Sequence, residues 1–491
     1  MDGERIQGMR RSKLPRALFA FPALATLVAA PRGARGSGLD APIVGSGQSG
    51  PTTADAAAIH WNPGALTAIG QGELFGGAGL IVGRAGYQRN RLGTYQTPDT
   101  LRYRTPLSPE YVGPSKQGWA EPVGATPIAP TGDLFFSAPV LDNRMALGLG
   151  VYVPYAAALD FPANGAQQWQ LRQAFIAATF VTGSVAVRVL PSLSLGAGVS
   201  YVGGVASLSK VQDFASLPEF NEAFNTFNQP NDFGPRAPTE VRELDVLSRP
   251  MSITNAVSHG VSFNAGLMYE PTRDLRLGLA YQHSAAMRYR GRFALDMNDP
   301  FFTQDLAAQG LRYKPLVEGD AEIAFTLPKR ITAGAGYQAT EQFRIDGFVS
   351  YVFYSDVDAF DVTTSSPDLA QPKLGIGEMV KVKLPRDWND TVWVEARGRH
   401  AFGRALAVSA TIGYQSPASP DETIDVSALD GHRLIGGVGA AVQATRWLSL
   451  HGDARVQGIM PRTVTTSAQD LGNGRYTLFV AYAGGHAKAR F

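Results

Sequence analysis

The sequence predicts an all-β protein: a transmembrane antiparallel β-barrel of about fourteen strands, with an N-terminal plug, or hatch, in its lumen. Three observations support this prediction: a leader typical of exported proteins, a long series of segments in which apolar and polar side chains alternate, and connections that are short and long in turn. No linker interrupts the chain after about residue 70, so we expect one large domain from there on.

The first 36 residues have the features of a secretory signal peptide. Basic residues between positions 10 and 16 precede an apolar run over residues 17–30, which is too short to span a bilayer but suits the hydrophobic region of such a peptide. Ala34-Arg35-Gly36 offers a cleavage site. No later segment has the length of apolar sequence that a membrane-spanning helix needs, so the exported chain can span a membrane only as a barrel.

Residues 37–71 follow the leader and do not alternate. They are rich in Gly, Ala and turn formers, which makes them too apolar for a disordered tail and too irregular for a strand. We expect them to form a compact hatch inside the lumen, and residues 72–491 to form the barrel.

The alternation is clearest over residues 275–293. Apolar side chains hold most of the odd positions, whereas arginines recur at even ones, among them Arg276, Arg288 and Arg290. We therefore expect the apolar face to contact lipid and the arginines to face the lumen. The same period of two recurs over residues 193–205, 261–269, 343–353, 406–414 and 448–456. A soluble antiparallel sandwich explains the alternation equally well, but it explains the leader and the strand lengths less well.

The connections predict how many strands there are and how they are oriented. Short connections fall near residues 140–143, 190–192, 271–274, 339–342, 401–404 and 444–446. Long connections lie between them, near residues 89–131, 155–170, 210–257, 293–320, 358–389, 416–431 and 460–474. This order predicts about fourteen strands with both chain ends on the periplasmic side, where outer-membrane barrels have their short turns. Residues 475–491 would form the closing strand.

The composition excludes several classes of function. A net charge of +2 gives no electrostatic reason to expect nucleic acid. The absence of cysteine excludes disulfides, thiolate metal sites and thiol nucleophiles. A barrel phospholipase is not favoured either, because the seven histidines are scattered and His283 and Ser284 should lie on opposite faces of one strand. We expect no enzyme activity, no cofactor and no metal.

The chain resembles the FadL-type long-chain fatty-acid and hydrocarbon transporters of Gram-negative outer membranes (OMPP1/FadL/TodX). The similarity to the family's N-terminal hatch lies in Gly38-Leu39, Asp55, Ala58 and Trp61-Asn62-Pro63. It continues through residues 145–155, 193–201, 327–332 and 388–391. One departure is Gly64, since the family usually has Ala directly after the Asn-Pro step. For the hatch residues, a structural turn and a ligand contact both remain open.

The resemblance implies capture of a long-chain fatty acid or related hydrophobic compound in an apolar groove between the third and fourth outer loops. The ligand would then pass to a barrel pocket and leave sideways after the hatch rearranges. The counterparts of the groove are Leu217, Phe220, Phe224 and Phe227, spaced like one face of a short helix, and Phe301, Phe302 and Leu306 in the fourth loop. Packing of these side chains against one another is the simpler interpretation.

Two further sets of residues have counterparts in that scheme. Gly148, Gly150 and Pro154 would kink the third strand and open a lateral gate, although ordinary barrel curvature also explains both glycines. Arg288 and Arg290 would pair with a ligand carboxylate, although pairing with lumen acids is the simpler interpretation.

The expected partners follow from this location. Besides the ligand we expect outer-membrane lipid, lipopolysaccharide and the barrel-assembly machinery, no nucleic acid, and a monomer. The alternative function is a barrel with a structural or surface-interaction role. An apolar pocket inside the lumen would favour transport, whereas a fully packed or open lumen would favour the alternative.

Overall fold

The computed structural model describes residues 40, 43–92, 94–95, 110–111, 117–214, 243, 246–374, 376–468 and 470–491, all within the unit Arg32–Phe491. The predicted signal peptide lies outside the described residues. So do most of the third outer loop and its predicted groove residues, which are Leu217, Phe220, Phe224 and Phe227.

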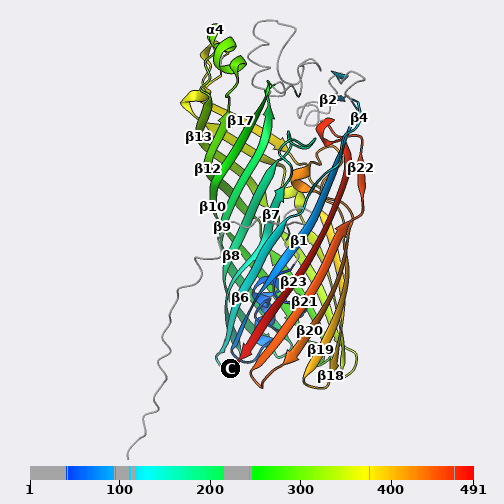
Figure 1. Cartoon of the computed structure of the whole chain (residues 1–491). Helices are drawn as coiled ribbons and strands as arrows, with labels where there is room; N and C mark the ends of the chain where they lie inside the picture. Colours follow the sequence, from blue (N-terminus) through cyan, green and yellow to red (C-terminus); the bar gives the residue numbers. More distant parts are fainter. Residues whose placement is uncertain are drawn as a thin grey trace, which may run out of the picture. The chain divides into compact units, whose positions relative to one another are not determined.

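The barrel closes because its first and last long strands pair. β1 (Glu73–Arg91) and β23 (Gly474–Arg490) are antiparallel neighbours in an unbroken register from Glu73↔Arg490 to Arg89↔Gly474. Within the described residues, twenty-one strands form this one sheet. Some of them follow one another along the same line, so the chain makes fourteen crossings from one end of the barrel to the other (Figure 1). The predicted all-β fold class is confirmed.

Several crossings consist of two strands separated by a short irregularity. The remaining strands of the sheet are β4 (Gly118–Trp119), β5 (Val123–Ala125), β6 (Ile128–Val140), β7 (Met145–Asp160), β8 (Gln173–Leu190), β9 (Leu193–Asp213), β10 (Ser248–Tyr269), β11 (Leu275–Gln282), β12 (Ala285–Asp296), β13 (Leu316–Leu327), β14 (Arg330–Gln338), β15 (Phe343–Val352), β16 (Ala359–Ser365), β17 (Met379–Pro385), β18 (Thr391–Phe402), β19 (Leu406–Gln415), β20 (Arg433–Gln443), β21 (Leu448–Ile459) and β22 (Arg462–Val464). In the first outer loop, β2 (Thr94–Tyr95) pairs only with β3 (Glu110–Tyr111).

Within the part of the chain that the structure describes, helices are few and short. They are α1 (Ala58–Trp61), η1 (Pro63–Ala68), η5 (Phe301–Asp305), α4 (Leu306–Ala308), η6 (Tyr354–Asp356), η7 (Pro367–Leu369), η8 (Pro372–Leu374), η9 (Val426–Ala428) and η10 (Asp470–Gly472). Among the described residues, no helix combines the length and apolarity needed to cross a membrane.

All six predicted short turns join consecutive crossings. In the turn between β6 and β7, for example, Leu141, Asp142 and Asn143 have φ values of 50°, 52° and 65°. This left-handed conformation is one that Asp and Asn tolerate better than most residues. The fifth long loop is shorter than predicted, because β16 and β17 extend the wall and leave only residues 366–378 between them.

The prediction of one uniform strand over residues 275–293 is wrong. In β11 the odd-numbered Leu277 and Leu279 face outward, as expected, but in β12 the odd-numbered side chains are buried. The pairing explains the reversal: the step from Val257 to Asn264 in β10 is seven residues, whereas the step between their partners, Gln282 and Arg290, is eight. The extra residue, at positions 283–284, inverts the two faces. Above this bulge the apolar residues therefore point into the lumen and the arginines point out.

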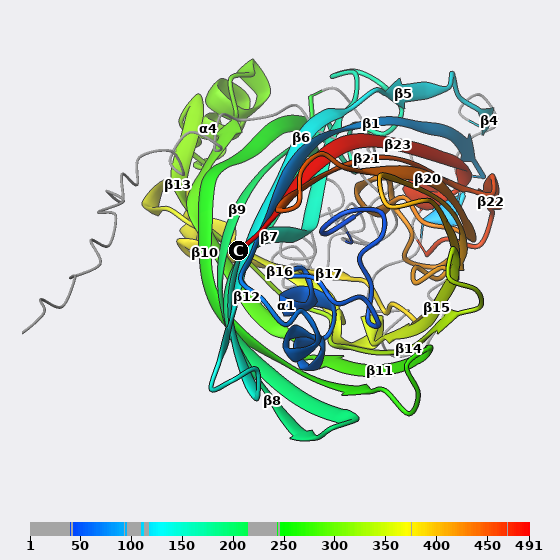
Figure 2. The ribbon, with the colours of Figure 1, turned by 90° about the horizontal axis from the view of Figure 1, so that it is seen from below.

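The N-terminal segment lies inside the ring of strands, where Figure 2 shows α1. The backbone of this segment packs directly against the backbone of strands in the barrel wall. A Cβ on Gly64 would lie 2.8 Å from the carbonyl oxygen of Gly266 in β10, and a Cβ on Gly196 in β9 would lie 2.4 Å from the carbonyl carbon of Pro63. Glycine at position 64, the departure from the family pattern, therefore permits this close approach.

Candidate functional site

The predicted hatch residues hold the hatch together and hold it to the wall. The Asn62 side chain donates to the carbonyl oxygens of Pro51 (2.8 Å) and Leu267 (3.0 Å) and accepts from the Gly64 backbone. Pro63 occupies the first turn of η1, where its missing N–H costs nothing. The Trp61 indole donates to the Val44 carbonyl at 3.0 Å. These contacts fit the structural interpretation of the motif.

Charged and polar wall residues fix the hatch from several sides. Asp55 forms an ion pair with Lys488 of β23 at 3.3 Å, and Glu73 of β1 accepts from the Ala56 backbone at 2.7 Å. Six more wall side chains bond the hatch, namely Asp133, Arg188, Ser194, Asn264, Asp346 and Arg397. The body of the hatch, residues 43–71, is therefore bonded to eight different strands.

Above the hatch the lumen holds an apolar cavity of about 300 Å³, which we call the pocket. Strands β8, β9, β10, β12, β13, β16 and β17 and the outer loops contribute to it. Its apolar lining includes Phe175, Ile176, Leu208, Ile253, Phe293, Leu295, Ile323, Phe325, Phe360, Val362, Val380, Val382 and Leu384. The bulge at residues 283–284 supplies part of this lining, because it turns the apolar side chains of β12 inward.

Two basic side chains that the sequence analysis did not predict, Lys210 and Arg386, line the pocket. Arg386, just after β17, forms an ion pair with Asp425 at 2.6 Å, and its guanidinium lies 4.4 Å from the centre of the Phe360 ring. Burial raises the pKa of the Asp425 carboxyl, but Arg386 and Ser427 outweigh this effect and hold the pKa below its usual value. The ammonium group of Lys210 in β9 is attracted electrostatically by the Asp425 carboxylate and repelled by the Arg386 guanidinium. Among the described residues its ammonium has neither a hydrogen bond nor an ion pair.

The prediction that Arg288 and Arg290 face the lumen is wrong. Their side chains are 69% and 72% exposed on the outer face of β12, and both guanidinium groups pair with Glu322 of β13. The reason is the reversed alternation above the bulge. Neither residue is placed to meet a ligand inside the barrel.

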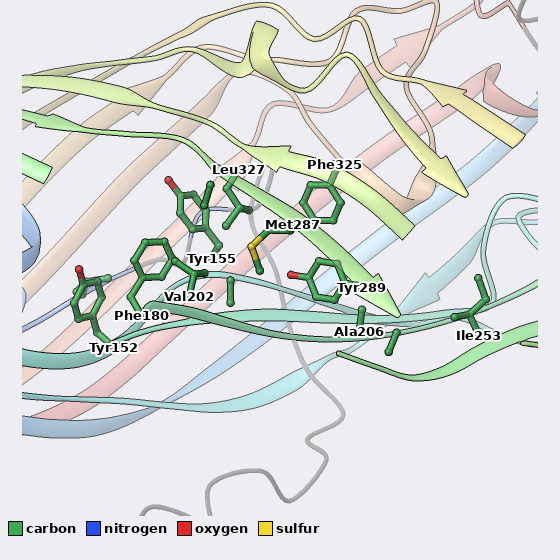
Figure 3. Close-up of a cluster of buried hydrophobic side chains, with 14 of the residues drawn as sticks. Tyr152, Tyr155, Phe180, Val202, Ala206, Ile253, Met287, Tyr289, Phe325 and Leu327 are labelled. Atoms are coloured by element: carbon green, nitrogen blue, oxygen red, sulfur yellow. The ribbon is translucent and has the colours of Figure 1, made fainter. Parts of the chain in front are cut away.

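A continuous row of buried side chains leads from the pocket to strand β7 (Figure 3). We call it the seam; its members are Tyr152, Tyr155, Phe180, Met287, Tyr289 and Leu327. The ring of Tyr289 stacks on Phe325 of the pocket with centroids 5.6 Å apart. At the other end, the Phe180 ring lies 5.8 Å from Tyr152 and 5.9 Å from Tyr155. The seam is apolar along its length except for the tyrosine hydroxyls.

The wall is interrupted where the seam ends. Pairing between β6 and β7 runs only from Val140↔Met145 to Leu134↔Val151. Beyond it, residues 128–133 of β6 pair with no strand but β1, and residues 155–160 of β7 pair with no strand but β8 among the described residues. The register of β7 with β8 shifts between Tyr152 and Tyr155, a step that contains Pro154. We call this break the gap.

Gly148 and Gly150 lie in β7 below the gap and serve packing. A Cβ on Gly148 would lie 2.8 Å from Ile59 of the hatch, and one on Gly150 would lie 2.7 Å from Phe135. Their small size therefore lets the hatch and β6 approach β7. The irregularity itself coincides with Pro154.

The N-terminal end of the hatch covers this region. Asp40 forms an isolated antiparallel bridge with Tyr155. Its carboxylate pairs with Arg330 of β14 at 2.7 Å and accepts from the Tyr354 hydroxyl at 2.8 Å. Arg330 also donates to the Tyr155 hydroxyl at 2.9 Å. One carboxylate thus connects the hatch, the opposite wall and the strand beside the gap.

The fourth outer loop packs behind the pocket. Phe302 is buried, with its ring 5.3 Å from Phe214 and 5.7 Å from Tyr313, both of which line the pocket. Phe301 packs against Phe302, and Leu306 begins α4 beside them. The groove that these residues were predicted to form with the third loop depends on residues that the structure does not describe.

Comparison with known proteins gives concordant matches. A family model described as outer membrane protein transport protein (OMPP1/FadL/TodX) matches residues 43–487. Outer membrane protein P1 of Haemophilus influenzae is 24% identical over 313 residues, which are 62% of this chain and 63% of that protein. The chain thus matches less than two thirds of that relative's length.

Solved structures share the fold at low identity. A FadL homologue of Pseudomonas aeruginosa superposes with a TM-score of 0.71 at 20% identity, covering 93% of this chain and 100% of that one. The Pseudomonas putida toluene transporter TodX gives 0.62 at 14% identity, with coverages of 91% and 96%. The Ralstonia pickettii toluene transporter TbuX gives 0.58 at 17% identity, with coverages of 91% and 97%.

Proposed function

Because the chain belongs to the OMPP1/FadL/TodX family of outer-membrane transport proteins, we propose that it carries long-chain fatty acids or related hydrophobic compounds from the outer loops into the membrane. The family is one of transporters rather than enzymes, and its members are outer-membrane channels for hydrophobic compounds.

The pocket is the observation that carries the proposal. A long acyl chain gains about 0.8 kcal/mol for each buried methylene, so about fifteen of them make passage through water cost roughly 12 kcal/mol. Such a ligand needs an apolar path, and the pocket of about 300 Å³ lies within the usual range for ligand sites. A barrel with only a structural role has no use for such a cavity, so the pocket favours transport over the alternative function.

Lys210 favours a ligand with an anionic end. The pocket is lined by the cations Lys210 and Arg386 and by the acids Glu422 and Asp425. Arg386 is paired with Asp425, whereas the Lys210 ammonium has no hydrogen bond or ion pair among the described residues. A carboxylate there would gain charge-assisted hydrogen bonds, whereas a plain hydrocarbon would not. We therefore favour fatty acids over aromatic hydrocarbons as the ligand class.

Capture would begin at the outer loops. The proposed groove comprises Leu217, Phe220, Phe224 and Phe227 of the third loop with Phe301, Phe302 and Leu306 of the fourth. Its support is the contact of Phe302 with the pocket residues Phe214 and Tyr313. A ligand leaving this groove would enter the pocket directly.

Release would be lateral, through the gap between β6 and β7. The seam leads there, whereas the body of the hatch, residues 43–71, is bonded to eight strands. At about 1 kcal/mol for each hydrogen bond, withdrawing the hatch from the lumen would cost on the order of 8 kcal/mol. Movement of the N-terminal end around Asp40 would break far fewer contacts, so it is the proposed gating step.

Uptake of labelled oleate by cells with and without this gene tests the proposal. We expect uptake to fall in the deletion strain and to return with the gene supplied in trans. Toluene uptake, measured in the same strains, should change less. If neither compound depends on the gene, the transport proposal is rejected and the structural role becomes the better explanation.

A further inference from the structure

Tyr289 has a buried hydroxyl group that the fold does not use. Its side chain is 0% exposed, and the hydroxyl oxygen has no hydrogen-bond partner among the residues that the structure describes. Leaving a polar group buried and unpaired costs free energy, and a phenylalanine would fill the same space without that cost. Among the described residues, the hydroxyl is therefore left free to bond a group that enters the pocket.

The position of this hydroxyl is the junction of the pocket and the seam. Tyr289 lines the pocket, and its ring stacks on Phe325. Its hydroxyl lies against Gly204 of β9. A Cβ built on Gly204 would be 2.7 Å from the Tyr289 hydroxyl oxygen and 2.8 Å from the methyl carbon of Met287. In Figure 3 the oxygen points along the seam toward Met287, in the direction of Tyr155. A ligand that passes from the pocket to the gap must pass this point.

Donors are spaced along the whole route. Lys210 and Arg386 lie in the pocket, Tyr289 lies at its exit, and Arg330 with Tyr155 lies beside the gap. Between the pocket cations and Arg330, the remaining seam side chains Met287 and Leu327 offer no donor. A polar head group crossing this stretch would lose its hydrogen bonds unless Tyr289 replaced them.

We propose that the Tyr289 hydroxyl receives the polar head group of the ligand as it moves from the pocket into the seam, by donating a hydrogen bond to one of its oxygen atoms. This inference rests on the proposed function and deepens it. It makes Tyr289 a specificity-determining residue that speeds the passage of oxygen-bearing compounds, such as carboxylic acids, and gives no advantage to a plain hydrocarbon.

Tyr289→Phe tests the inference, because it removes one oxygen atom and keeps the stacked ring. We expect it to slow the initial uptake of labelled hexadecanoate by about tenfold, the effect of losing one hydrogen bond to a charged acceptor. Uptake of labelled hexadecane, which has no acceptor, should not change. Tyr337→Phe is the matched control: Tyr337 is an exposed residue of the outer face, so its hydroxyl should not affect either probe. Rates are compared per assembled barrel.

The outcomes separate the two proposals. If the wild-type gene supports uptake of neither probe, the proposed function fails, and this inference fails with it. If the wild type takes up hexadecanoate and Tyr289→Phe slows both probes equally, Tyr289 has only a structural role. If Tyr289→Phe slows neither probe, its hydroxyl does not meet the ligand. Either of the last two results overturns the inference and leaves the proposed function standing.

Discussion

At the scale of single residues, Lys210 shows what the sequence can and cannot reveal. It is the one basic residue of β9, and it follows Gly204, Ala206 and Leu208 on the same alternating set of positions. Lys210 is the only charged side chain on this set of positions in β9, which is a signal that could have been found. The inward position of Tyr289 could not, because it depends on a bulge that only the pairing partner reveals.

Replacing Lys210 with Met should weaken the binding of oleate to the purified protein about tenfold or more. The reason is the loss of a charge-assisted hydrogen bond to the carboxylate, which is worth about 1.5–3 kcal/mol. Equilibrium binding of labelled oleate in detergent measures this effect. Lys381→Met is the control, since Lys381 lies on the outer face of β17. Equal affinity in both variants would remove Lys210 from the binding site.

At the scale of elements, turns were easier to predict than faces. Four of the six short turns contain Gly, Asp, Asn or Pro, and in the other two the hydroxyl of Thr340 or Thr445 accepts from the backbone two and three residues further on. The fourteen crossings could therefore be predicted from the sequence alone. The face of a strand depends instead on its register with a neighbour, and a single extra residue reverses it. For this reason β12 was assigned the wrong face, and with it Arg288 and Arg290.

Deleting Ser284 should prevent assembly of the barrel. Without the extra residue, Arg288 and Arg290 would turn into the apolar pocket, where the effective penalty is several kcal/mol for each unpaired charge. Heat-modifiable migration of membrane extracts on a gel reports folded barrel. Ser284→Ala keeps the length of the segment and should assemble normally. A deletion variant that assembles as well as Ser284→Ala would show that the bulge does not decide the orientation of β12.

The loop groove makes a separate prediction at this scale. Replacing both Phe220 and Phe224 with Ser should lower oleate uptake at limiting concentration, because apolar capture surface is lost. Uptake at saturating oleate and the amount of assembled barrel should stay close to wild type. Unchanged uptake at low concentration would reject the assignment of these residues to the groove.

At the scale of the whole molecule, the hatch and the gap differ in how firmly they are bonded to the barrel. The hatch blocks the lumen and is bonded around the ring of strands, whereas the wall beside β7 lacks pairing on one side. In the proposed mechanism, the pocket, the seam and the gap form one apolar route that leaves through the wall. The account's central claim is that ligand follows this route while the body of the hatch stays in place.

A reversible lock on the hatch tests this claim most directly. A Cβ built on Gly47 would lie 3.4 Å from the Cβ of Asp453 in β21, close to the separation found in disulfides. The chain has no other cysteine, so Gly47→Cys with Asp453→Cys forms a single defined crosslink. Asp453→Cys alone controls for loss of the carboxylate. The measurement is oleate uptake before and after reduction. The account predicts equal uptake in the two states; uptake that is lost on oxidation and restored by reductant would contradict it.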